Sequence, residues 1–111
     1  MKQQDTFLAI DTTSYTQTSV GFVVNGKLKE LVEKTGHTKS QQVLPMIEEL
    51  LRREKKSLRD VREIKVAPGP GSFTGTRVGI AVANTLGWIL KVPVNDKHMA
   101  LPIYEPSKFD E

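Results

Sequence analysis

The 111-residue sequence contains no cysteine, which excludes disulfide bonds, thiolate metal sites and a cysteine nucleophile. Its two histidines, His37 and His98, form no HxxxH or HExxH pair, so no metal site is predicted. Neither of them accompanies a nucleophilic serine motif, and no residue is assigned a catalytic role. No apolar run approaches the roughly 18 residues of a membrane helix, and the first five residues carry no hydrophobic signal region. We therefore expect a cytoplasmic protein.

The remaining composition is that of one ordinary globular domain. Hydrophobic residues make up 38% and charged residues 26%, which suffices for a single core at this length. The net charge of +3 is only mildly basic. Its densest cationic cluster, within residues 52–62, fits either a solvated helix end or a contact with nucleic-acid phosphates.

Hydrophobic periodicity predicts an α/β fold with two main helices. Asn25-Gly26 between two runs of β-forming residues is a strong hairpin signal, and the charged alternation of residues 27–34 suits a sheet edge. Pro45 is acceptable in a helix only in its first turn or at a bend. The predicted strands are residues 6–10, 18–24, 27–34, 63–67 and 92–94, and the predicted helices are residues 38–55 and 76–91.

The second predicted helix is unusual because apolar residues leave it almost no polar face. Gly79, Ala83 and Gly87 recur every four residues and form a stripe of small side chains that lets another backbone approach closely. One side of this helix can lie on the sheet, and the rest needs a second cover. That cover is either another subunit, or the first helix together with the C-terminal tail.

A glycine-rich loop between a strand and this helix is the most distinctive segment, Pro68-Gly69-Pro70-Gly71-Ser72-Phe73-Thr74-Gly75. Backbone amides and a helix N-terminus favour an anion there, although the loop matches neither the Walker A nor the GxGxxG pattern. It fits a structural turn or an anion contact. Asp11, at the end of the first strand, fits a magnesium-phosphate contact or the cap of a turn.

Three segments resemble the TsaB family, also called YeaZ. Leu8-Ala9-Ile10-Asp11-Thr12-Thr13 is similar to its opening strand and turn, and Gln41-Gln42-Val43-Leu44-Pro45 to its Gln-x-x-Leu-Pro helix start. Residues 69–79 resemble its signature loop almost residue for residue. The resemblance covers roughly residues 6 to 95.

The resemblance implies a ribonuclease-H-like lobe of the actin-like ATPase and Hsp70 architecture. We expect a mixed five-stranded sheet, with three antiparallel strands first, over residues 1–95, and an irregular tail over residues 96–111. The family pairs with the catalytic subunit TsaD, joined by TsaE, to threonylcarbamoylate the adenosine beside the anticodon of tRNA. The resemblance then implies a non-catalytic support subunit that contacts tRNA indirectly. No hydrolytic motif in the sequence supports the family's older label of peptidase M22 or glycoprotease.

In this family, helix pairs hold the two subunits together. The resemblance therefore implies a partner interface on the two helices, at Pro45, Met46, Leu50, Gly79, Val82, Ala83, Leu86 and Gly87. The same surface predicts a homodimer when the chain is alone. Two alternatives stay open: a nucleotide-binding or ATPase protein of actin-like fold, and a self-associating homodimer without a role in tRNA modification.

The sequence departs from the family in two places. Lys39 precedes Ser40-Gln41 where members usually carry a histidine, and His37 stands two residues earlier. The family's C-terminal lobe is missing; our hypothesis is a natural compact form, and a truncated chain is the alternative. We expect no cofactor of its own, because a single lobe can only share an ATP or ADP site at the subunit border. The residues expected to touch the nucleotide or its phosphates there are Asp11, Gly69, Gly71, Ser72 and Thr74.

Overall fold

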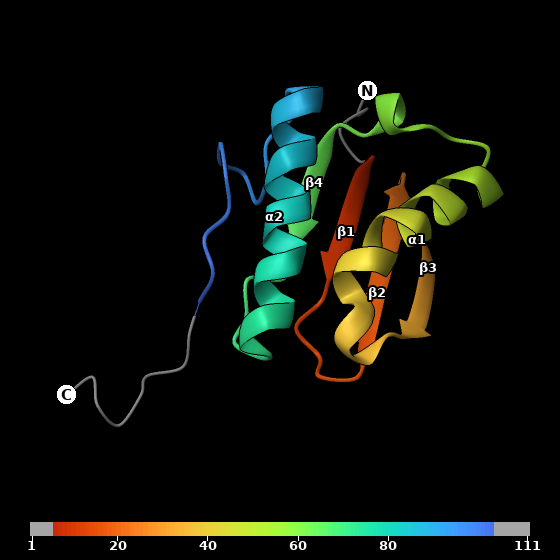
Figure 1. Ribbon diagram of the computed structural model, residues 1–111. Helices are drawn as coiled ribbons and strands as arrows, with labels where there is room; N and C mark the ends of the chain where they lie inside the picture. Colours follow the sequence, from red (N-terminus) through yellow and green to blue (C-terminus); the bar gives the residue numbers. More distant parts are fainter. Residues whose placement is uncertain (1–5, 104–111) are drawn as a thin grey trace.

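The computed structural model describes residues 6–103, in which four strands form one mixed sheet in the order β3-β2-β1-β4. β1 (Phe7–Asp11), β2 (Gln17–Val24) and β3 (Lys27–Lys34) are antiparallel neighbours, and β4 (Glu63–Val66) runs parallel to β1 (Figure 1). The predicted α/β architecture with three antiparallel strands first is therefore confirmed.

The hairpin between β2 and β3 forms where the sequence predicts it. Asn25 and Gly26 have φ angles of 54° and 82°, the two positive values that a type I′ turn requires. β3 then forms one edge of the sheet, since β2 is its only strand neighbour in the described part of the chain.

The prediction of a fifth strand at residues 92–94 is wrong, because only Val94 pairs with the sheet, through a parallel bridge to Ile64. Positive φ at Asn95 (52°) and Asp96 (67°) then turns the chain away. Beyond this bridge, the Asn95 amide donates to the Val66 carbonyl at 2.9 Å and accepts from the Val66 N–H at 2.8 Å. An asparagine side chain therefore completes the β4 edge where a strand was expected.

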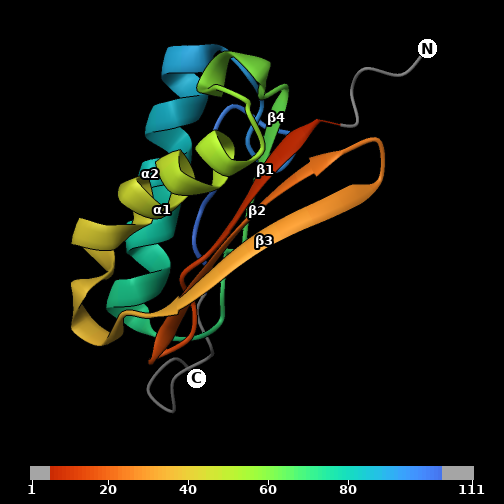
Figure 2. The same cartoon turned by 90° about the vertical axis from the view of Figure 1, so that its right-hand side faces the viewer.

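Both main helices cover the same face of the sheet (Figure 2). α1 (Lys39–Arg53) follows the short 3₁₀ helix η1 (Gly36–Thr38), and α2 (Phe73–Leu90) follows β4. A second 3₁₀ helix, η2 (Leu58–Asp60), lies between α1 and β4. Pro45 lies inside α1, and the helix bends along its length (Figure 2), as expected for a proline beyond the first turn.

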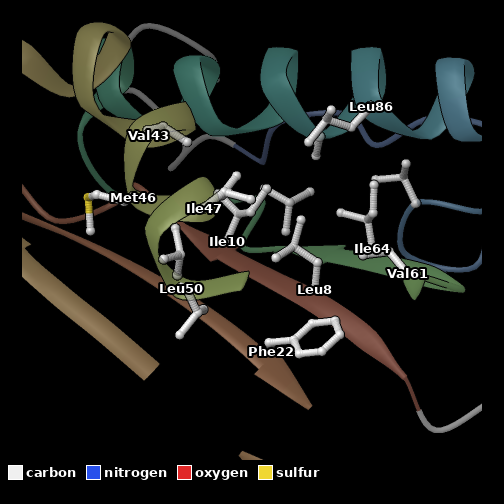
Figure 3. Close-up of a cluster of buried hydrophobic side chains, with 14 of the residues drawn as sticks. Leu8, Ile10, Phe22, Val43, Met46, Ile47, Leu50, Val61, Ile64 and Leu86 are labelled. Atoms are coloured by element: carbon white, nitrogen blue, oxygen red, sulfur yellow. The ribbon is translucent and has the colours of Figure 1, made fainter. Parts of the chain in front are cut away.

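One hydrophobic core fills the space between the sheet and the two helices (Figure 3). Leu8 and Ile10 of β1 point into it, together with Phe22 of β2 and Ile64 of β4. The helices contribute apolar side chains that include Val43, Met46, Ile47, Leu50 and Leu86. No helix within residues 6–103 is both long and apolar enough to cross a lipid bilayer.

Candidate functional site

The turn after β1 meets the glycine-rich loop at one end of the sheet, where α1 and α2 also begin (Figure 1). β1 and β4 are parallel, so their carboxyl ends lie at this same edge. The loop is joined to the turn by its backbone, since the Ser72 N–H donates to the Thr13 carbonyl at 2.8 Å. The structure thus brings together Asp11, Gly71 and Ser72 from the predicted phosphate-contact set.

Asp11 is exposed, and its carboxylate holds its own turn. Its Oδ1 accepts hydrogen bonds from the Thr13 N–H at 2.9 Å and from the Thr13 hydroxyl at 2.7 Å. This is the local side-chain-to-backbone pattern that aspartate commonly makes in turns. Of the two interpretations of Asp11, the observed contacts agree with the cap of a turn.

Thr12 is fully buried and connects this turn to α2. Its hydroxyl donates to the Gly75 carbonyl at 2.5 Å and accepts from the Gly79 N–H at 3.1 Å. Those are two groups that bond directly to each other in a regular α-helix, four residues apart. The Thr12 side chain therefore inserts into the first turns of α2. Sequence reasoning missed this residue, because nothing in the sequence shows that Thr12 meets a helix more than 60 residues further along the chain.

The glycines of the loop and helix allow this close approach. A Cβ added at Gly71 would lie 2.5 Å from the Thr13 carbonyl oxygen, and one at Gly75 would lie 2.6 Å from the Thr12 carbonyl oxygen. A Cβ at Gly79 would collide with the Thr12 hydroxyl. Packing against the β1 turn thus accounts for these three glycines without a ligand.

The remaining loop residues have separate roles. Ser72 is the N-cap of α2, and its Oγ accepts from the Gly75 N–H at 3.0 Å. Gly69 has a φ of 103° and lies against the carbonyl of Ile103. Thr74 is exposed in the first turn of α2.

Lys39, at the start of α1, is a second residue that sequence reasoning did not assign to this region. The side chain is buried, with 4% of its surface exposed. Its Nζ donates to the Gln17 carbonyl and to the hydroxyls of Thr18 and Thr35, at 3.1 and 3.2 Å. Burial lowers the pKa of Lys39, and the nearby charge of Asp11 opposes that shift. His37 is exposed in η1.

The observed contacts at this junction hold the turn after β1 against the glycine-rich loop and the start of α2. The hydroxyls of Thr12, Thr18 and Thr35 and the buried Lys39 ammonium are hydrogen-bonded within the chain. The buried hydroxyl of Thr76, in the first turns of α2, has no hydrogen-bond partner among the described residues. Among the described residues, no three histidine, aspartate or glutamate side chains gather where they could hold a metal ion.

The residues predicted for a partner interface lie mostly inside the chain. Met46, Leu50, Ala83 and Leu86 are buried in the core, and Gly79 lies against Thr12. Gly87 lies against Val94, whose Cγ2 atom would be 2.5 Å from an added Cβ. Pro45 is exposed and Val82 is half-buried. Of the predicted set, these two can reach a partner directly, and the others can shape such a surface only from beneath.

Other apolar side chains of the two helices are exposed instead. Trp88 is 81% exposed, Ile89 59% and Leu44 46%. These three residues, with Pro45 and Val82, are called the helix surface below. Sequence reasoning placed Trp88 in a core or an interface, and the structure leaves it outside the core.

Comparison with known proteins gives consistent matches. The family model described as "TsaD: tRNA N6-adenosine threonylcarbamoyltransferase" matches residues 31–106. The tRNA threonylcarbamoyladenosine biosynthesis protein TsaB of Bacillus subtilis is 34% identical over 90 residues, which cover 81% of this chain and 39% of that protein. TsaB of Haemophilus influenzae is 37% identical, over 83% of this chain and 39% of its own length.

A solved structure agrees with these sequence matches. YeaZ from Pseudomonas aeruginosa superposes with a TM-score of 0.78 at 33% identity, over 88% of this chain and 44% of its own chain. The chain therefore spans about two fifths of the relatives that it matches. The predicted resemblance is confirmed: the chain belongs to the family that the TsaD model describes, in which its homologues are the TsaB (YeaZ) proteins.

Proposed function

We propose that this chain is a non-catalytic subunit that pairs with a TsaD protein and supports threonylcarbamoylation of the adenosine next to the anticodon in tRNA. The names of its TsaB relatives place those proteins in threonylcarbamoyladenosine biosynthesis. In this proposal TsaE joins the pair, and tRNA is met indirectly through the complex.

The helix surface is the observation that carries the proposal. A single domain rarely leaves a tryptophan 81% exposed beside an isoleucine 59% exposed on one helix without a partner for them. Large aromatic side chains of this kind are enriched at protein interfaces, where they supply much of the binding energy. The helix surface is therefore the proposed contact with TsaD.

The β1–α2 junction supports a scaffold role. Its glycines pack against Thr12 and Thr13, and the Asp11 carboxylate holds its own turn. We propose that residues 1–95 act as a ribonuclease-H-like lobe and residues 96–111 as a tail. Any nucleotide would lie at the border with TsaD, within reach of Asp11, Ser72 and Thr74.

Co-expression with TsaD from the same genome tests the proposal, with light scattering to measure mass and stoichiometry. A stable one-to-one complex is expected. Trp88→Glu should weaken it by about tenfold or more, because a charge replaces an apolar anchor. Val32→Glu is the matched control, since Val32 is also apolar and 47% exposed but lies on β3. Absence of a complex, or equal weakening by both variants, would reject the proposal.

The actin-like nucleotide-binding alternative has its own test. Tight, magnesium-dependent binding of ATP by the isolated chain, measured by calorimetry, would favour that function. Asp11→Asn and Ser72→Ala should then both reduce the affinity. The scaffold proposal expects no such binding without TsaD.

A further inference from the structure

The excess positive charge of the chain lies in one segment, residues 49–62, which leads from the end of α1 through η2 to the start of β4 (Figure 1). This basic segment contains six lysines and arginines against three acidic residues, so its net charge of +3 equals that of the whole chain. Four of the five arginines in the sequence are among the six. The six cationic residues, all exposed, are Arg52, Arg53, Lys55, Lys56, Arg59 and Arg62.

Backbone hydrogen bonds fix the first half of the basic segment. The Lys56 N–H donates to the Leu51 carbonyl at 2.8 Å, and the Lys55 N–H donates to the Arg52 carbonyl at 3.1 Å. This is the Schellman pattern that ends many helices, and it puts Lys55 in the left-handed conformation, with a φ of 57°. Glycine is the usual residue there because it adopts positive φ without strain. The need to end α1 therefore does not explain a lysine at this position.

The second half of the basic segment is fixed as well. At the start of η2, the Asp60 carboxylate accepts from the Ser57 N–H at 2.8 Å. After η2, the Arg62 N–H donates to the Thr6 carbonyl beside β1 at 3.0 Å. The cationic side chains therefore extend from a backbone of defined shape, which reduces the entropy that is lost when they bind a ligand.

Contacts within the chain neutralise only two of the six cations. The Glu49 carboxylate accepts from Arg52 at 2.6 Å and from Arg53 at 2.8 Å. Both arginines lie in the last turn of α1, where the helix dipole also favours a cation. A solvated helix end thus explains these two residues. The cations whose side chains form no hydrogen bond or ion pair within residues 6–103 are Lys55, Lys56, Arg59 and Arg62.

The composition of the basic segment indicates which kind of anion it fits. Guanidinium groups bind phosphate through two parallel hydrogen bonds and are enriched where proteins contact nucleic acids. The segment contains no aromatic residue on which an unpaired base could stack. In a double-stranded RNA stem the major groove is too deep and narrow for side chains to read, so a stem is bound mainly through its backbone and shape. The segment therefore fits the phosphates of a stem better than it fits unpaired bases.

We infer that the basic segment binds the phosphate backbone of an RNA stem directly and without selecting its sequence. The inference goes beyond the proposed function, which brings tRNA to this chain only through TsaD. The choice of RNA over DNA rests on that function, whereas the contact with phosphates rests on the charges of the segment. No residue of the basic segment belongs to the helix surface, so the two contacts use different side chains.

The four cations without an internal partner predict a weak contact that depends steeply on salt. Each phosphate that a cation neutralises releases a condensed counterion, so the logarithm of the binding constant falls linearly with the logarithm of the salt concentration. Four such contacts predict a slope of about −3. The dissociation constant should lie between about 1 and 100 µM, the range of contacts that do not depend on sequence.

Fluorescence anisotropy of a labelled RNA hairpin, titrated with the full chain in the absence of TsaD, tests the inference. The titration is repeated at salt concentrations from about 25 to 150 mM to obtain the slope. The double variant Lys56→Gln, Arg59→Gln removes two of the four cations. It should raise the dissociation constant by about tenfold or more and should make the slope shallower by about 2.

The double variant Lys34→Gln, Arg77→Gln is the matched control, because it removes the same charge from two other exposed residues. Lys34 ends β3 and Arg77 lies in the first turns of α2, at the end of the sheet where both helices begin. The control should change the dissociation constant by less than about twofold, since these residues lie outside the basic segment. Circular dichroism checks that each variant is folded.

Three results would each overturn the inference. The first is no binding of the hairpin by wild type up to about 0.5 mM chain at the lowest salt concentration. The second is equal weakening by the two double variants, which would mean that net charge acts without a defined site. The third is equally tight binding to phosphatidylserine vesicles, which would identify the surface as a general polyanion contact. None of these results bears on pairing with TsaD, which the co-expression experiment tests separately.

Discussion

Thr12 links the end of β1 to α2 through a single hydroxyl that both donates and accepts. Thr12→Val keeps the shape of the side chain but removes both hydrogen bonds. The Gly75 carbonyl and the Gly79 N–H then lose their partner in the Thr12 side chain. Because these groups are buried, we expect the free energy of unfolding to fall by about 1–3 kcal/mol. Urea unfolding followed by circular dichroism measures the change.

Thr13→Val is the matched control for this prediction. The Thr13 hydroxyl bonds only to Asp11 in a solvent-exposed turn, so its removal should cost well under 1 kcal/mol, roughly the value of an exposed hydrogen bond. Equal losses in the two variants would mean that insertion into α2 contributes nothing to stability.

Glu63 should make stability depend on pH. Burial raises the pKa of this carboxyl, and a hydrogen bond with Asp96 raises it further, against the opposing charge of Lys65. The folded state therefore holds the proton more tightly than the unfolded state. The stabilisation is complete below the ordinary glutamate pKa of about 4.3 and is lost as pH rises through the raised value.

Glu63→Gln removes this titration. The free energy of unfolding of wild type relative to the variant should decrease as pH rises across the window, as measured by urea unfolding at a series of pH values. A difference between the two proteins that stays constant over that range would contradict the stated cause.

At the scale of elements, the β4 edge is completed by one side chain. Asn95→Ala removes both hydrogen bonds to the Val66 backbone and should lower the free energy of unfolding by about 1–3 kcal/mol. Asn95 has a positive φ, so Asn95→Gly separates the loss of the amide from backbone strain. If the glycine variant is as stable as wild type, the amide does not hold this edge.

Most elements could be predicted because their patterns are local. Apolar runs, β-forming residues and charged alternation located β1 to β4 to within one residue at each end, and Asn25-Gly26 located the hairpin. α2 begins three residues earlier than predicted, because Ser72 caps it. Thr38 precedes α1 but does not cap it, since its hydroxyl donates to the Thr35 carbonyl. The prediction of a fifth strand was wrong because the Asn95 side chain, and not a strand backbone, bonds to the Val66 backbone.

The site was harder to predict because it depends on contacts between distant segments. Spacing showed that Gly79, Ala83 and Gly87 share one side of a helix, but it could not say what that side meets. The structure places Thr12 and Val94 against the two glycines and buries Ala83. Periodicity likewise predicted that α2 needs a second cover, but could not show that Trp88 is the residue left without one.

At the scale of the whole molecule, binding at the helix surface can be followed by fluorescence. Trp88 is the only tryptophan in the sequence, and it is 81% exposed on the helix surface. The isolated chain should emit as an exposed indole does, and binding of TsaD should shift the emission to shorter wavelength as water is removed. A concentration series of the chain alone is the control, because a shift to shorter wavelength with rising concentration would mean that two copies pair through the helix surface without TsaD.

The Asn95 contact with β4 also limits how the molecule can assemble. An endless cross-β stack needs two open strand edges on every copy. At β4, the backbone groups of Ile64 and Val66 are taken by Pro93 and Asn95. Among the described strands this leaves β3 as the edge that can accept another strand, so edge-to-edge addition ends after one pairing. A capped sheet of this kind gives finite assemblies and resists growth into fibrils.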